Sequence, residues 1–90
     1  MKFKEYRQKL AEKSGLEVRQ IDLAIMLGLE VDFKDEKSQS ISNWENERTT
    51  PNETTIKLCE LLLSLSRKEI RRKIREARAK ILEGLKELRG

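Results

Sequence analysis

Apolar residues recur along this chain at spacings of three and four, which is the period of an α-helix rather than of a strand. The first stripe, Phe3, Tyr6 and Leu10, ends at Ser14-Gly15. The second stripe consists of Val18, Ile21, Ala24, Ile25 and Leu27 or Leu29, with Gly28 near its end. The pattern therefore predicts an all-α protein.

Two capping boxes divide the C-terminal part of the chain. Thr50-Pro51-Asn52-Glu53 places proline at the first helical position and predicts a helix beginning there. Its inward residues would be Ile56, Cys59, Leu62 and Leu63. Ser66-Arg67-Lys68-Glu69 is the second box, with Leu65 and Ile70 placed for a hydrophobic staple. We expect a break at residues 64–66 and a separate helix over 67–88.

The final helix carries an apolar stripe whose members advance by three or four residues. They are Ile70, Ile74, Ala77, Ile81, Leu85 and Leu88. On a chain this short the stripe covers the domain's own core, meets a second copy or captures another protein. We favour a homodimer through these six residues, which makes 66–90 a dimerisation element, with internal packing as the alternative.

Residues 38–51 combine two apolar anchors with a polar face. Ile41 and Trp44 lie three apart and share one side of a helix. The opposite side would carry Ser38, Gln39, Ser42, Asn43 and Asn46. Amide side chains can pair bidentately with adenine, and serine adapts to donors or acceptors. The pattern therefore indicates a nucleic-acid reader, with a solvated helix face as the alternative.

The run Ile41-Ser42-Asn43-Trp44-Glu45, followed by polar residues and Pro51, resembles the recognition helix of the Cro/repressor helix-turn-helix family, in the xenobiotic-response-element class. Gln20, Ala24 and Gly28 resemble that family's second helix, and residues 55–62 resemble its closing helix. The resemblance covers residues 16–63. It implies a lambda-repressor-like helix-turn-helix bundle of about four helices over 1–65, followed by the C-terminal amphipathic helix.

The resemblance also implies roles for single residues. DNA base contacts would come from Ser38, Gln39, Ser42 and Asn43. DNA phosphate contacts would come from Gln20, Arg19, Ser40, Asn46, Arg48 and Thr49. Glu45 matches an inward carboxylate that pairs with an arginine of the first helix, for which Arg7 is the candidate. The alternative is a partly solvated Glu45, because an unpaired buried carboxylate would be costly.

One segment departs from the family pattern. A helix-turn-helix joins its two helices by about 3–4 residues, whereas residues 29–37 form an insertion here. Asp35 could cap an early recognition helix, or Val31 and Phe33 could lie on a short extended segment. We interpret the insertion as a surface feature with Phe33 against the core. The alternatives are a partner contact and a lever that tilts the recognition helix.

Charge is unevenly distributed along the chain. Residues 1–66 carry ten basic and twelve acidic side chains, a net of −2, whereas 67–80 carry eight basic against two acidic, a net of +6. DNA-binding proteins gain much of their affinity by neutralising phosphates. The basic flank of the last helix, with Arg71, Arg72, Arg75 and Arg78, would therefore either follow phosphates beside the operator or be simply solvated.

Composition narrows the function classes. Ninety residues with 40% charged side chains allow one small domain. One cysteine and no histidine make a disulfide or a zinc site poor expectations and favour a reducing, cytoplasmic setting. A nucleoid-associated location would follow from the DNA binding that the resemblance implies. With no phosphate-binding loop or nucleophile–base pair, we expect neither an enzyme nor a cofactor. No signal peptide, membrane span or ligand pocket is evident.

Together these features predict a sequence-specific regulator of transcription that binds double-stranded DNA. The leading role is a dimeric repressor at a palindromic operator, of the phage, prokaryotic or antitoxin-like autorepressor type; an activator is a further alternative. The alternative from another class is a protein–protein adaptor or antitoxin with the same fold. It would bind its partner through the C-terminal helix or the acidic insertion.

Overall fold

The computed structural model describes residues 2–89 and is all-α over that range. The helices there are α1 (Phe3–Ser14), α2 (Gln20–Met26), α3 (Gln39–Glu45), α4 (Glu53–Ser64) and α5 (Arg67–Arg89). The one β-type pairing in this part of the chain is an isolated antiparallel bridge between Asp32 and Lys37. No helix of residues 2–89 is both long and apolar enough to cross a membrane.

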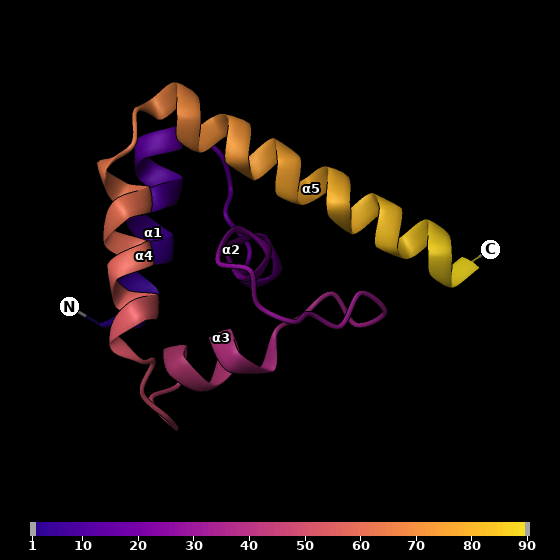
Figure 1. Cartoon of the computed structure of the whole chain (residues 1–90), viewed down its shortest axis with the longest axis horizontal. Helices are drawn as coiled ribbons and strands as arrows, with labels where there is room; N and C mark the ends of the chain where they lie inside the picture. Colours follow the sequence, from indigo (N-terminus) through magenta and orange to yellow (C-terminus); the bar gives the residue numbers. More distant parts are fainter. Residues whose placement is uncertain (1, 90) are drawn as a thin grey trace.

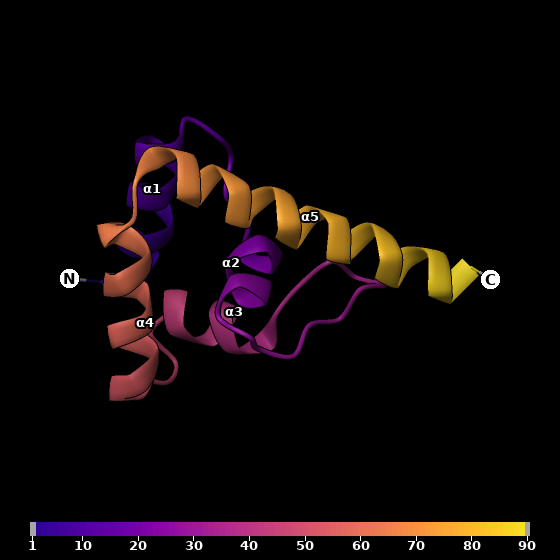
Figure 2. The same cartoon turned by 45° about the horizontal axis from the view of Figure 1, so that its top comes forward.

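The helices surround one core, with α2 at the centre. In Figure 1, α1 and α4 lie together at one end, α5 runs across the domain, and α3 lies on the other side of α2 from α5. The same separation of α3 from α5 is visible after a 45° turn (Figure 2). Both α3 and α5 pack against α2.

Helix α1 begins and ends as its sequence pattern predicts. Phe3, Tyr6 and Leu10 are all buried, and Gly15 follows the helix in a left-handed conformation with φ 72°. The Gly15 N–H donates to the Ala11 carbonyl at 2.8 Å. A side chain at Gly15 would be strained by this φ and would also lie 2.7 Å from the Arg67 guanidinium.

The starts of α3 and α4 differ from the predicted ones. Helix α4 begins after Asn52, whose side chain accepts from the Thr55 N–H at 2.8 Å, so Thr50 and Pro51 lie outside the helix. The prediction of a Thr50 cap was wrong because Asn52, a stronger N-cap residue, follows two positions later. Helix α3 is capped by Ser38 and not by Asp35, whose own N–H donates to the Asp32 side chain within the insertion.

The break before α5 lies where the sequence predicts it. Leu65 is extended, and the Ser66 hydroxyl accepts from the Glu69 N–H at 3.2 Å. This hydrogen bond caps a helix of 23 residues, Arg67–Arg89. The predicted separate final helix is thereby confirmed.

The apolar stripe of α5 packs inside the domain. Ile70 and Ile74 are 0% exposed, and Ala77 and Ile81 are 2% and 3% exposed, because α5 crosses α2 and α1 and closes the core over them. The prediction that these four residues form a dimer interface was wrong, and the alternative of internal packing is correct. Of the six predicted residues, only Leu85, half-buried, and Leu88, 60% exposed, retain accessible apolar surface.

Candidate nucleic-acid interface

Helix α3 is anchored by the two apolar residues that its sequence pattern singles out. Ile41 is completely buried, and Trp44 packs against the core with its ring edge-to-face on Phe3, at 5.1 Å between ring centroids. Gln39 and Ser40 are exposed, and Ser42 and Asn43 are half-buried on the solvent side of the helix. We call these four residues the reading face.

An ion pair fixes the C-terminal end of α3. Arg7 donates to both carboxylate oxygens of Glu45, at 2.7 and 2.8 Å, and also donates to the Val18 carbonyl at 3.0 Å. Gln20 adds a third hydrogen bond to Glu45, at 3.1 Å. The Glu45 side chain is only 5% exposed, so the predicted Arg7 partner is confirmed and the solvated alternative is wrong. One carboxylate thus joins α1, α2 and α3, and the Glu45 hydrogen bonds raise the pKa of Arg7.

Gln39 and Asn43, the two amides of the reading face, are hydrogen bonded to each other. The Gln39 Nε2 donates to the Asn43 Oδ1 at 3.0 Å, across one helical turn. This arrangement leaves the Gln39 Oε1 as an acceptor and the Asn43 Nδ2 as a donor on the exposed side. Adenine offers a matching donor and acceptor, N6 and N7, in the major groove. The pair can therefore present one bidentate reader instead of two independent amides.

Two other predicted residues, Ser38 and Asn46, are engaged within the protein. Ser38 is 1% exposed and its hydroxyl accepts from the Ile41 N–H at 3.3 Å, so the prediction that Ser38 contacts bases was wrong. It was wrong because the first residue on the predicted polar face serves as the N-cap of the helix instead. Asn46 turns back on the end of α3, where its Nδ2 donates to the Ser42 carbonyl at 2.9 Å and approaches the Ser42 hydroxyl at 3.4 Å.

The predicted phosphate contacts divide into engaged and accessible side chains. Arg19 contacts Asp22 at 3.2 Å and Glu36 at 3.5 Å, and its pKa is raised chiefly by the hydrogen bond to Asp22. Gln20 is held by Glu45. Exposed side chains remain at Ser40, Arg48, Thr49 and, partly engaged, Asn46. Lys37, exposed and directly before the Ser38 cap, was missed by sequence reasoning, although its place next to a predicted reader could have marked it.

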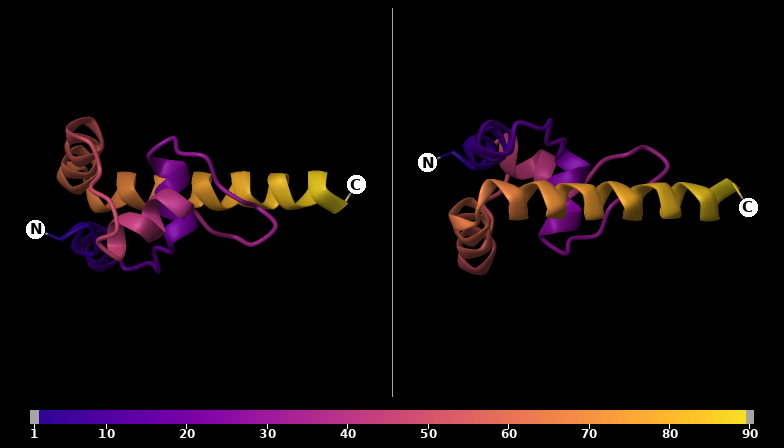
Figure 3. Two further views of the ribbon diagram at one scale, coloured as in Figure 1. Left: turned by 90° about the horizontal axis from the view of Figure 1, so that it is seen from below. Right: turned by 90° about the horizontal axis from the view of Figure 1, so that it is seen from above.

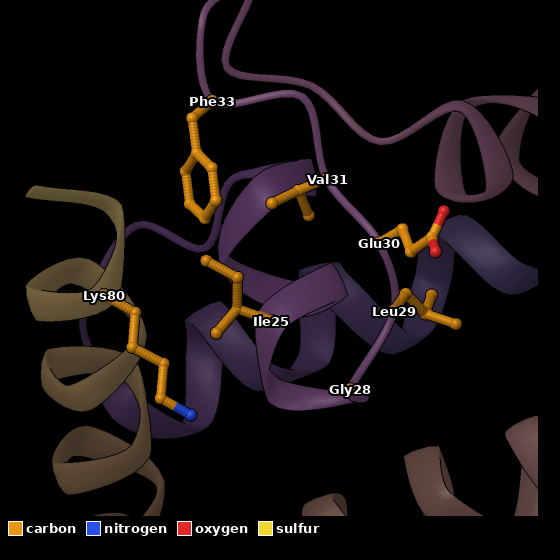
Figure 4. A pocket seen from close by; sticks show the side chains of 7 residues that line it. All are labelled: Ile25, Gly28, Leu29, Glu30, Val31, Phe33 and Lys80. Carbon is orange, nitrogen blue, oxygen red and sulfur yellow. The ribbon is translucent and has the colours of Figure 1, made fainter. Parts of the chain in front are cut away.

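The insertion folds as a short hairpin. Asp32 and Lys37 exchange two backbone hydrogen bonds, at 2.9 and 3.2 Å. Phe33 packs on Gly84 of α5, where an added Cβ would lie 2.6 Å from the ring. The expected packing of Phe33 against the core was wrong in that the ring lies on the C-terminal part of α5, whereas Val31 is the residue of this segment that packs against the core. Side chains of the hairpin, α2 and α5 border a surface hollow of about 500 Å³ (Figure 4), which the sequence pattern did not reveal.

The cations of α5 lie away from the reading face. Figure 3 shows this separation: α3 lies nearer the viewer than α5 in the view from below, and α5 lies nearer the viewer than α3 in the view from above. Arg71 and Arg78 turn toward the domain and donate to the Ser14 and Glu17 carbonyls, at 2.9 and 2.7 Å. A duplex bound by α3 would therefore not be flanked by the outer side of α5, which contradicts that prediction for Arg72 and Arg75.

Neither a metal site nor a known relative adds to this picture. Among residues 2–89 no group of three or more acidic, cysteine or histidine side chains is placed to hold a metal ion. Comparisons with protein-family models, with curated proteins and with solved structures found no match.

Proposed function

We propose that this chain is a sequence-specific double-stranded DNA-binding regulator of transcription, with α2 and α3 acting as a lambda-repressor-like helix-turn-helix. The observation that carries the proposal is the hydrogen-bonded amide pair Gln39–Asn43, which lies on a helix whose opposite side is packed against the core. Ile41, Trp44 and the Arg7–Glu45 ion pair supply that support. Such rigid placement is what a side chain needs to discriminate between base edges.

In the proposed complex, α3 lies in the major groove. Gln39 and Asn43 contact a base pair. Ser42 directly precedes Asn43 on the helix, and its hydroxyl can donate a hydrogen bond to a neighbouring base. Phosphate contacts come from Ser40 on α3 and from three exposed residues that border the helix, Lys37, Arg48 and Thr49. Arg19 and Gln20 do not contact phosphate in this complex, because their side chains already bind the carboxylates of Asp22 and Glu45.

The test is a selection of bound sequences from random duplex DNA. We expect wild-type protein to enrich one motif, and Gln39→Ala and Asn43→Ala each to relax it at one base pair by about 5- to 150-fold, the range of a lost bidentate contact. Gln8→Ala, an exposed glutamine of α1, is the matched control and should leave the motif unchanged. A motif that survives in both amide variants would reject the reading face.

We propose that the regulator is a homodimeric repressor, which occludes a promoter by binding two half-sites of a palindromic operator. Because most of the α5 stripe is buried, the dimer contact is assigned to the two stripe residues that retain accessible apolar surface, Leu85, half-buried, and Leu88, 60% exposed. Sedimentation should give a dimer for wild type and a monomer for Leu85→Lys/Leu88→Lys. A monomeric wild-type protein would reject this part of the proposal.

A protein–protein adaptor or antitoxin is the second candidate, favoured by the low positive charge around α3. Residues 1–66 have a net charge of −2, and Arg19 is neutralised by Asp22 and Glu36. An adaptor would enrich no DNA motif in the selection. Its partner would dock on the acidic hairpin, so Asp35→Lys/Glu36→Lys would abolish binding of the partner. Neither wild type nor this variant would enrich a DNA motif.

A further inference from the structure

The outer side of α5 carries a straight row of exposed residues. Its members succeed one another at spacings of four, three, four, three and four, so they lie on one line along the helix. They are Lys68, Arg72, Arg75, Ala79, Leu82 and Lys86. From Lys68 to Lys86 the helix rises about 27 Å at 1.5 Å per residue. We call this line the outer row; it lies opposite the buried stripe of α5.

The positive charge of this part of α5 is almost unopposed. Among the described residues, the only ion pair made by the eight cations of 67–80 is Arg72–Glu76, at 3.9 Å. Both partners are largely exposed, 68% and 63%, so water and salt screen this pair strongly. Arg71 and Arg78 bond to backbone carbonyls, which leaves their charge uncompensated. By contrast, Arg7 and Arg19 beside α3 each have a carboxylate partner.

Three kinds of anionic partner could bind the outer row: a membrane, single-stranded nucleic acid or a DNA duplex. A membrane-bound helix inserts an apolar face, but the apolar face of α5 is buried in the domain's core. Single-stranded nucleic acid is held by stacking on aromatic rings, and α5 has no aromatic residue. Three cations of the row, Lys68, Arg72 and Arg75, follow one another at about 6 and 4.5 Å along the helix, which suits the closely spaced phosphates of a duplex. Lys68, Arg72 and Arg75 also border a surface hollow of about 480 Å³, together with Ser66 and one carboxylate, Glu69, so three cations face one acidic side chain there.

We propose that the outer row of α5 binds the phosphate backbone of double-stranded DNA, independently of sequence. Because α2 separates α5 from α3, this duplex lies on the opposite side of the protein from the reading face (Figures 1 and 3). One protein molecule can then hold two DNA segments at once. The binding to α5 does not depend on the proposed function, whereas the bridging of two segments rests on it.

The first test measures affinity for random duplex DNA as a function of salt. Arg72→Gln/Arg75→Gln should reduce the steepness of log K against log salt by about 1.8. Lowering the salt from 1 M to 0.1 M would then strengthen binding about 60-fold less in the variant than in wild type. Lys9→Gln/Lys57→Gln removes the same charge from exposed positions on α1 and α4 and should change the slope little. Equal losses in both pairs, or no loss in the α5 pair, would overturn the proposal.

The second test separates the two DNA-binding surfaces. Gln39→Ala/Asn43→Ala should keep full affinity for random duplex, so a failed reading face would not disturb the first test. Duplex tethered to beads and carrying the selected motif should retain a labelled random duplex only when wild-type protein is added. Retention that persists in Arg72→Gln/Arg75→Gln would overturn a bridging role for α5, and binding of that face to anionic lipid vesicles but not to duplex would overturn the choice of DNA.

Discussion

The ion pair between Arg7 and Glu45 allows the most direct test of how α3 is held. Glu45→Leu removes a carboxylate that is 5% exposed and leaves the Arg7 guanidinium, 23% exposed, facing the core without a counter-charge. Breaking one partner of a buried pair costs about 3–5 kcal/mol. Because water still reaches part of Arg7, we expect the lower end, about 3 kcal/mol, which is a large fraction of the 5–15 kcal/mol typical for a small domain.

The assay is urea unfolding followed by the fluorescence of Trp44, the neighbour of Glu45 on α3. The double variant Arg7→Leu/Glu45→Leu removes both charges together, and we expect it to be more stable than Glu45→Leu alone. Glu76→Gln is the surface control, since its pair with Arg72 is exposed and should contribute less than about 0.5 kcal/mol. If Glu45→Leu unfolded at the same urea concentration as Glu76→Gln, the pair would not be holding α3.

Three further predictions concern the supports of α3 and the core. Ser38→Ala should lower the free energy of unfolding by about 1 kcal/mol, because it removes the α3 N-cap, and an unchanged urea midpoint would contradict that role. Gly84→Ala should destabilise by about 1–2 kcal/mol through the clash with Phe33, yet stabilise by about 1 kcal/mol in a Phe33→Ala background; the same sign in both backgrounds, measured by thermal unfolding, would disprove the contact. Burial raises the pKa of the Cys59 thiol from 9.0 to about 11, so the unfolded chain loses this proton first; the free energy of unfolding should be constant below pH 9 and fall between pH 9 and 11. That alkaline fall should be smaller in Cys59→Ala, and iodoacetamide should leave native Cys59 unmodified at pH 8.

The features predictable from the sequence were those set by local periodicity and capping. The stripe of α1, the end at Gly15 and the break at Ser66 follow from spacing and from the conformational preferences of single residues. The inward direction of Ile41 and Trp44 follows in the same way. The Arg7–Glu45 pair, 38 residues apart, could be predicted only through the family resemblance, because spacing says nothing about which distant charges meet.

The features that could not be predicted depend on how the elements pack. The apolar stripe of α5 indicates that one face of the helix is buried. The same stripe would suit packing on the domain's own core or on a second copy of the chain. Ser38 belonged to the polar face by periodicity, and only the exact start of α3 made it a buried cap. The contact of Phe33 with Gly84 joins an irregular segment to a distant helix, which leaves no periodic signal.

The shortness of α3 has a consequence for when the reading face exists. Its seven residues are fewer than the roughly 12–15 that an isolated helix needs to be even marginally stable in water. The helix therefore depends on its contacts with the rest of the domain, which include the hydrogen bonds of Arg7 and Gln20 to Glu45. Opening of α3 from these contacts would remove the proposed reading face, so this face can be lost by local unfolding at a free energy below that of the whole domain.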